Sequence, residues 1–202
     1  MLEGLLVDLV PVWDDFPQRE TVWRNSDASF WSSGGERYIM SRAAVERQFA
    51  QWAQHDAQAR VHRLSFGIQT KDGQRIGWIG INWMVPHNRL AMLGAKIGEP
   101  DYWGGGYGTD ALLLLIDHAF DWLDMRKIWL YTTSMNARVK RQMEKVGFTL
   151  EAQIREGTYA DGAWYDWLAY SLFDTEWPGR EALVASLGLR ERAAALEAAG
   201  SS

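Results

Sequence analysis

A glycine-rich segment is the part of this chain whose residue types and spacing point most directly to chemistry. It spans residues 102–111 and reads Tyr-Trp-Gly-Gly-Gly-Tyr-Gly-Thr-Asp-Ala. Glycines let an anion approach the backbone closely and let successive amides point to one side. A helix expected to begin at Thr109 would add unpaired N–H groups and the positive end of its dipole. The segment therefore predicts a phosphate-binding site.

Known phosphate-binding glycine loops are distinguished by the residues that follow the glycines. A Walker loop is excluded, because no Gly-Lys-Ser/Thr follows the glycines. Gly106, Gly108 and Ala111 do fit the dinucleotide pattern G-x-G-x-x-G/A. That pattern also requires an acidic residue at the end of the next strand, where this chain has Thr132-Thr133-Ser134. A simple tight turn is the remaining interpretation of the loop by itself.

The loop also resembles a known family. It is similar to the pyrophosphate loop of the GNAT superfamily of acyl-CoA-dependent N-acetyltransferases, and most of all to the RimJ/RimL type. The resemblance covers roughly residues 5–177. The supporting motifs, in chain order, are Trp23-Arg24-Asn25, Ser41 with Glu46 and Trp52, Asn136 with Glu144-Lys145-Val146-Gly147-Phe148, Glu156-Gly157, residues 162–166 and Tyr170-Ser171-Leu172.

This resemblance implies acetyl-CoA as co-substrate and no metal. Two strands, 90–98 and 128–133, should splay into a V that holds the pantetheine, which would pair with the backbone around Ala95, Lys96 and Ile97. Asn136 would hydrogen-bond the pantetheine, although Asn is equally suited to a simple N-cap. The diphosphate would lie on the loop, whose implied contact residues are Trp103, Gly104, Gly105, Gly106, Tyr107, Gly108 and Thr109.

The chain departs from the family pattern at the catalytic positions. Val139 and Met143 stand where the family has a Ser or Tyr that protonates the departing thiolate, and Met92 stands where it often has a carboxylate. Ser134 is the candidate for thiolate protonation because it follows the strand nearest the expected thioester. Asp166 matches a family position on the final hairpin and is the second candidate catalytic residue, although orienting a loop is its more ordinary role.

The missing base favours a weakly basic acceptor. Neutralising a lysine-like amine at pH 7 costs about 4.6 kcal/mol, whereas an α-amine costs about 1.1 kcal/mol. We therefore expect an amine-bearing small molecule or a protein N-terminus as partner, with a protein or peptide α-amine favoured. Acetylation of an aminoglycoside or polyamine is one alternative, and a catalytically silent CoA-binding protein is another.

Composition narrows the protein class. The chain has 202 residues and a net charge of 21 − 26 = −5, which disfavours a nucleic-acid partner. It has no cysteine, and its four histidines show no metal-binding spacing. The longest apolar run, residues 111–116, is far too short to span a membrane, and no basic residue precedes Arg19 as in a secretory signal. We expect a cytoplasmic monomer or homodimer.

Hydrophobic periodicity indicates the elements that position these residues. It predicts an α/β fold with one domain over residues 1–178 and a helical tail over 179–202. The resemblance makes this a GNAT-like mixed, mostly antiparallel sheet, flanked by helices and split between its central strands. The expected strands are 5–12, 64–68, 76–84, 90–98, 128–133, 149–155 and 164–173, and the expected helices are two pieces over 16–56, then 109–124 and 136–146.

Twelve tryptophans and 19 glycines are unusual numbers for this length. Trp78 and Trp83 lie five apart on one expected strand, which predicts that they point to opposite faces. Trp164 and Trp167 are also separated by an odd number of residues. One member of each pair could line an acceptor groove, while most of the tryptophans would fill the core.

Overall fold

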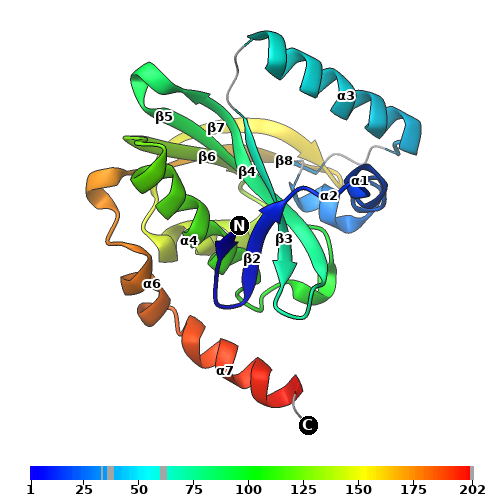
Figure 1. The fold of residues 1–202 in the computed structure, drawn as a ribbon. Helices are drawn as coiled ribbons and strands as arrows, with labels where there is room; N and C mark the ends of the chain where they lie inside the picture. Colours follow the sequence, from blue (N-terminus) through cyan, green and yellow to red (C-terminus); the bar gives the residue numbers. More distant parts are fainter. Residues whose placement is uncertain (33, 36–38, 60–62, 201–202) are drawn as a thin grey trace.

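A single mixed sheet of eight strands organises the chain in this computed structural model (Figure 1). The structure describes residues 1–32, 34–35, 39–59 and 63–200. The strand order is β1-β2-β3-β4-β5-β6-β8-β7, and only the β5–β6 pair is parallel. The strands are β1 (Leu2–Glu3), β2 (Val7–Pro11), β3 (Leu64–Thr70), β4 (Arg75–Val85), β5 (Leu90–Ile97), β6 (Lys127–Thr133), β7 (Thr149–Ala160) and β8 (Ala163–Phe173).

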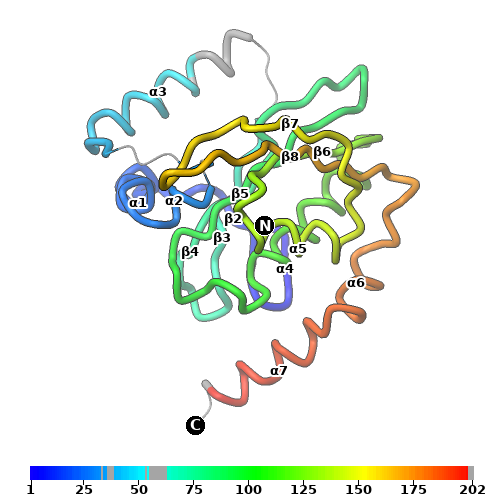
Figure 2. Tube along the Cα trace, turned by 180° about the vertical axis from the view of Figure 1, so that it is seen from behind, coloured from blue at the N-terminus to red at the C-terminus, as the bar shows by residue number. Residues whose placement is uncertain are grey.

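Helices cover the sheet in two groups. Both views place α1, α2 and α3 together and apart from α4, and Figure 2 shows α5 apart from them as well (Figures 1 and 2). Helix α4 is buried on every side from residue 110 to 116, because the sheet, α6 and the N-terminal segment surround it. The helices are α1 (Phe16–Arg24), α2 (Asp27–Ser32), α3 (Arg42–Ala59), α4 (Tyr107–Asp117), α5 (Ala137–Val146), α6 (Arg180–Ser186) and α7 (Leu189–Gly200).

The predicted split between the central strands is confirmed. Strands β5 and β6 pair only at their first residues, where Leu90, Ala91 and Met92 face residues 127–129. Beyond this point no ladder joins the two strands, so the sheet opens between them. The opening leaves main-chain groups of both strands available for a ligand instead of for each other.

Several predicted boundaries were wrong. The N-terminal helical region forms three helices rather than two, and α4 begins at Tyr107 rather than Thr109. The helix after the glycine loop changes to a π-helical turn at residues 118–122. The closing strand β7 runs to Ala160, beyond the predicted end at 155, because a bulge in its pairing with β8 lets the ladder resume.

The prediction for Trp78 and Trp83 was also wrong. Trp78 lies opposite Lys96 and Trp83 opposite Met92, and these two partners are four residues apart on the same face of β5. Asn82 is an extra residue in β4, since Ile81 and Trp83 pair with consecutive residues of β5. A bulge of this kind reverses the alternation of side chains, so both tryptophans face the same side.

The many glycines and tryptophans account for one another in part. A Cβ on Gly98 would lie 2.2 Å from the Trp23 ring, and one on Gly67 would lie 2.6 Å from the Trp13 ring. A Cβ on Gly157 would lie 2.1 Å from Trp167. At these positions glycine provides the space in which an indole packs flat on the backbone.

A buried carboxylate joins the N-terminal segment and α6 to α4. Asp110 is fully buried, and its Oδ2 accepts hydrogen bonds from the backbone amides of Leu5, Leu6 and Val7 at 2.8, 2.7 and 3.2 Å. Its Oδ1 pairs with Arg180 at 3.1 Å. Because Asp110 sits in the first turn of α4, this contact fixes the N-terminal segment and α6 next to the glycine loop.

Replacing this carboxylate tests how much it contributes to the stability of the fold. Asp110→Ala leaves three buried amides and one guanidinium without their acceptor, so we expect a loss of about 3–5 kcal/mol in the free energy of unfolding, measured in urea. Glu46→Ala is the control, since Glu46 forms one exposed pair with Arg42 and should cost less than about 1 kcal/mol. Equal losses in the two variants would contradict the anchoring role.

Candidate functional site

The glycine loop forms a set of unpaired amides at the start of α4. Gly104 and Gly106 have φ of +80° and +94°, and Gly106 is the N-cap of the helix. Its carbonyl accepts from Thr109 and Asp110 at 3.0 and 2.9 Å, which closes the first turn. Among the described residues, the amides of 104–108 donate to no protein acceptor. The helix dipole adds to the positive potential at this point, as an anion-binding loop requires.

A basic cavity of about 400 Å³ lies along this loop. In the described part of the chain, no Asp or Glu lines it. This is notable in a chain whose net charge is −5. The charge of this lining is complementary to a ligand with several phosphates. Its cationic lining residues are Arg138, Arg141, Lys145 and Arg192, together with Lys96, whose ammonium is paired with Glu20.

Trp103 and Arg138 form one wall of this cavity. The Trp103 indole donates to the carbonyl of Ile97 at 2.9 Å, and the Arg138 guanidinium lies 4.0 Å from the centre of the Trp103 ring. Burial lowers the pKa of Arg138, and Arg141 adds to the shift. Trp103 therefore acts through its side chain, attaching the loop to the end of β5.

The opening between β5 and β6 continues the cavity inward. A smaller cavity of about 120 Å³ lies there and shares Ala95, Gly108 and Asn136 with the basic cavity. It shares Gly94 and Tyr131 with a third cavity of about 660 Å³. The three cavities form one path from the glycine loop, through the split sheet, to a space on the other side. We call the third cavity the acceptor cavity.

Main-chain direction decides which predicted strand residues face the opening. The amide of Gly98 donates to Ile76 of β4 at 2.8 Å, while the Ile97 carbonyl points away from β4 to Trp103. Alternate residues of a strand direct their backbone groups to opposite sides. The backbone of Ala95 therefore faces the opening, that of Lys96 faces β4, and the carbonyl of Ile97 is already taken.

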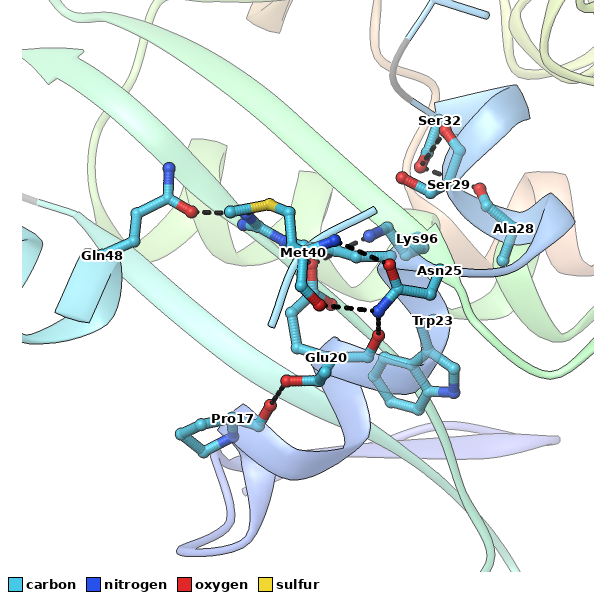
Figure 3. Close-up of polar contacts among 12 residues, drawn as sticks. Pro17, Glu20, Trp23, Asn25, Ala28, Ser29, Ser32, Met40, Gln48 and Lys96 are labelled. Atoms are coloured by element: carbon cyan, nitrogen blue, oxygen red, sulfur yellow. Dashed lines mark hydrogen bonds and ion pairs between the residues drawn. The ribbon is translucent and has the colours of Figure 1, made fainter. Parts of the chain in front are cut away.

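An ion cluster forms the wall of the acceptor cavity (Figure 3). Glu20 on α1 accepts at Oε1 from Lys96 at 2.9 Å and from Arg24 at 2.8 Å. Burial is the main cause that lowers the pKa of Lys96, and the attraction of Glu20 opposes it. Arg24 also donates to Gln48 on α3. The predicted site residue Lys96 thus presents its side chain to the acceptor cavity as a paired cation.

Asn136 performs the cap that was one of its two predicted roles. Its Oδ1 accepts from the amide of Val139 at 3.3 Å, and its Nδ2 donates to the carbonyl of Trp31 at 3.1 Å. It lines the opening between the strands, so it remains a candidate contact for a ligand there. The bond to Trp31 also joins α2 to α5 across the cavity.

Ser134 and Asp166 are brought together, but outside all three cavities. The Ser134 hydroxyl accepts from the amide of Asp166 at 3.0 Å. The Asp166 carboxylate accepts from the amide of Glu156 at 2.8 Å and from Gln153. These two bonds, the first above all, lower the pKa of Asp166. The contacts stabilise the β7–β8 bulge, where Glu156 has a φ of +51°.

Tyr131 was not among the predicted site residues, although the sequence places it near the expected thioester. It lies on β6, where its ring contacts Trp167 at 5.2 Å, and it lines both the opening and the acceptor cavity. Met92 lines the acceptor cavity, where a carboxylate was expected from the family pattern.

Within the described ranges, no group of three or more His, Asp or Glu could hold a metal ion, and no helix is long and apolar enough to cross a bilayer.

Comparison with known proteins agrees with this geometry. Residues 7–149 match the family described as acetyltransferase (GNAT) domain. The chain therefore belongs to the GNAT acetyltransferase family, and the match covers most of its length.

Individual relatives fall within the same family. A protein of Bacillus subtilis strain 168, provisionally named ribosomal N-acetyltransferase YdaF, is 31% identical over 110 residues, which are 54% of this chain and 60% of that protein. The chain thus spans about 60% of the length of this relative. A spermidine N-acetyltransferase from Vibrio cholerae, solved with CoA and spermine, superimposes with a TM-score of 0.73 at 18% identity, covering 85% of this chain and 97% of that one. RimJ from Mycobacterium smegmatis, solved with CoA-disulfide, gives 0.71 at 24% identity, covering 90% and 89%.

Gly108 gives a clean test of the path. A Cβ there would lie 3.5 Å from Ile97 and 4.0 Å from Gln142, which is ordinary contact, whereas one on Gly106 would meet Leu6 and Leu189 at 3.1 and 3.2 Å. We expect Gly108→Ala to keep CoA affinity within about threefold. Gly108→Phe should fill the opening and weaken binding at least a hundredfold in calorimetry. Unchanged affinity in a folded Gly108→Phe variant would exclude this path.

Proposed function

We propose that this protein transfers the acetyl group of acetyl-CoA to the α-amine of a protein or peptide, or to another weakly basic amine. Acetyl-CoA would bind along the glycine loop and enter the split sheet, and the acceptor would enter from the acceptor cavity. In the transfer, the neutral amine nitrogen forms a bond to the acetyl carbon and loses a proton, the carbon–sulfur bond breaks, and the departing thiolate takes up a proton. The observation that carries this proposal is the charge of the acceptor cavity.

That charge disfavours a polycation. Arg24 and Lys96 line the cavity, and of the residues that the structure describes Glu20 is the one carboxylate there. Glu20 is shared between the two cations. A polyamine would bring several positive charges to a wall whose two cations share Oε1 of one carboxylate, while the buried Oε2 has no hydrogen-bond partner among the described residues. Burial strengthens the repulsion between the cations and a polyamine. A substrate with a single amine meets a smaller penalty.

The same wall supports a weakly basic amine. Met92 occupies the position where the family often has a carboxylate, and Glu20 accepts hydrogen bonds from both Lys96 and Arg24 at Oε1. Without a free base, the acceptor must lose its proton to water before attack. An α-amine does this at pH 7 for about 1.1 kcal/mol, compared with about 4.6 kcal/mol for a lysine.

Each alternative retains some support. The Vibrio cholerae neighbour solved with spermine favours a polyamine acceptor, as does the net charge of −5. A CoA-binding protein without catalysis is favoured by Val139 and Met143, because these side chains have no acidic proton to donate at the family's donor positions. A cytoplasmic location and a monomer or homodimer stay predictions from the sequence.

For thiolate protonation we propose Tyr131 in place of Ser134. Its hydroxyl is borne by a residue that lines both the opening and the acceptor cavity, so it is near the point where sulfur and amine must meet. Ser134 instead accepts a hydrogen bond from the backbone of Asp166 and lines none of the three cavities.

An acceptor panel tests the substrate class. Thiol release from acetyl-CoA is followed with a peptide whose only amine is its N-terminus, with Nα-acetyl-lysine, with spermidine and with an aminoglycoside. We expect kcat/KM at pH 7 to be at least tenfold higher for the peptide, and to rise with pH until the amine is neutral near pH 8. Preference for spermidine would contradict the proposal. CoA binding with no turnover on any amine would favour the catalytically silent alternative.

Substitution of Tyr131 tests the proton donor. Tyr131→Phe removes the hydroxyl and keeps the ring contact with Trp167, so we expect kcat to fall about 10–100-fold with KM for acetyl-CoA unchanged. Ser134→Ala is the matched control and should keep kcat within about twofold. The reverse order of effects would restore Ser134 as the candidate donor.

A further inference from the structure

The C-terminal helices are part of the folded body where they begin. Val184 on α6 is fully buried, and Leu189, the first residue of α7, is 2% exposed. The pair between Arg180 and Asp110 fastens α6 to α4 at a fully buried carboxylate. The first turn of α7 is therefore held near the glycine loop, while its later turns leave the body of the protein (Figures 1 and 2).

Arg192 extends from this first turn to the loop. Its Nη1 donates to the carbonyl of Gly104 at 3.3 Å, and its Cδ lies 3.5 Å from the place of a Cβ on Gly106. It lines the same basic cavity as these two glycines. A residue from the last tenth of the chain thus reaches the amides that start α4.

Arg192 differs from the neighbouring arginines in its ion pairing. In the described chain no carboxylate pairs with it, whereas the nearby Arg190 pairs with Glu181, and Arg180 pairs with Asp110. Its one hydrogen bond uses a single donor of a guanidinium that has five. A guanidinium matches the geometry of two phosphate oxygens, and hydrogen bonds to an anion are the strong ones.

We propose that Arg192 binds the diphosphate of CoA, so that the C-terminal helix completes the cofactor site together with the loop amides. This rests on the proposed use of acetyl-CoA at the glycine loop. The loop supplies N–H groups, and Arg192 supplies a cation that lines the same cavity. The tail of residues 179–202 then belongs to the functional unit, and the cofactor contacts extend beyond the stretch that matches the family.

Calorimetry on the full-length protein tests this assignment. We expect Arg192→Gln to weaken CoA binding about tenfold at low salt, with a smaller loss at high salt because the contact is partly exposed. Arg190→Gln, on the same helix, is the control and should stay within about twofold. The two variants should have the same Tm as the wild type within error, which separates a binding effect from a folding effect.

Ligands lacking particular phosphates identify the contact. With 3′-dephospho-CoA the tenfold loss should persist, since the diphosphate remains, and with pantetheine the Arg192→Gln substitution should have no effect. Equal CoA affinity in wild type and Arg192→Gln would overturn the proposal. A loss that disappears on 3′-dephospho-CoA would also overturn it, by moving Arg192 to the 3′-phosphate. Failure of the wild type to bind CoA at all would instead overturn the assignment of the cofactor, and this proposal with it.

Discussion

The carboxylate of Asp110 is the contact on which the arrangement of the site depends. It lies one turn after the N-cap glycine of α4, so whatever it binds is placed next to the loop amides. It binds the amides of residues 5–7 and the guanidinium of Arg180. The N-terminal segment and the start of α6 therefore meet at the helix that carries the loop. Removing a buried carboxylate leaves its donors uncompensated, which makes such a contact costly to lose.

Unpaired main-chain groups are the second common element of the site. The loop leaves the amides of 104–108 without protein acceptors, and the split between β5 and β6 leaves the backbone of Ala95 without a strand partner. Such groups are expensive when buried dry and favourable when a ligand or water satisfies them. These main-chain groups and the basic lining residues lie along one continuous path. A long molecule that carries phosphates and amides therefore finds a complementary surface, even though the net charge of the chain is −5.

Much of this could be predicted from local sequence. The glycine spacing, the Asn136 cap and the alternation of β5 depend on a few neighbouring residues, and the structure contains all three. The faces of Trp78 and Trp83 could not be predicted, because one additional residue at Asn82 reverses the alternation and a bulge has no firm local signal. The contacts of Ser134 and Asp166 likewise depend on the pairing of β6 with β8.

The sequence by itself determined that the glycine loop resembles the family's pyrophosphate loop, that the sheet is mixed, and that the family's usual thiolate proton donor and general base are absent. These features depend on residue identity and short spacing. The tertiary structure decided what depends on contacts between distant segments. It placed Glu20 against Lys96, 76 residues apart, and Arg192 against Gly104, 88 residues apart. No periodicity encodes such pairs. The first pair arises because a buried charge must find its counter-charge. The second arises because the packing of α6 and of the start of α7 brings Arg192 to the loop.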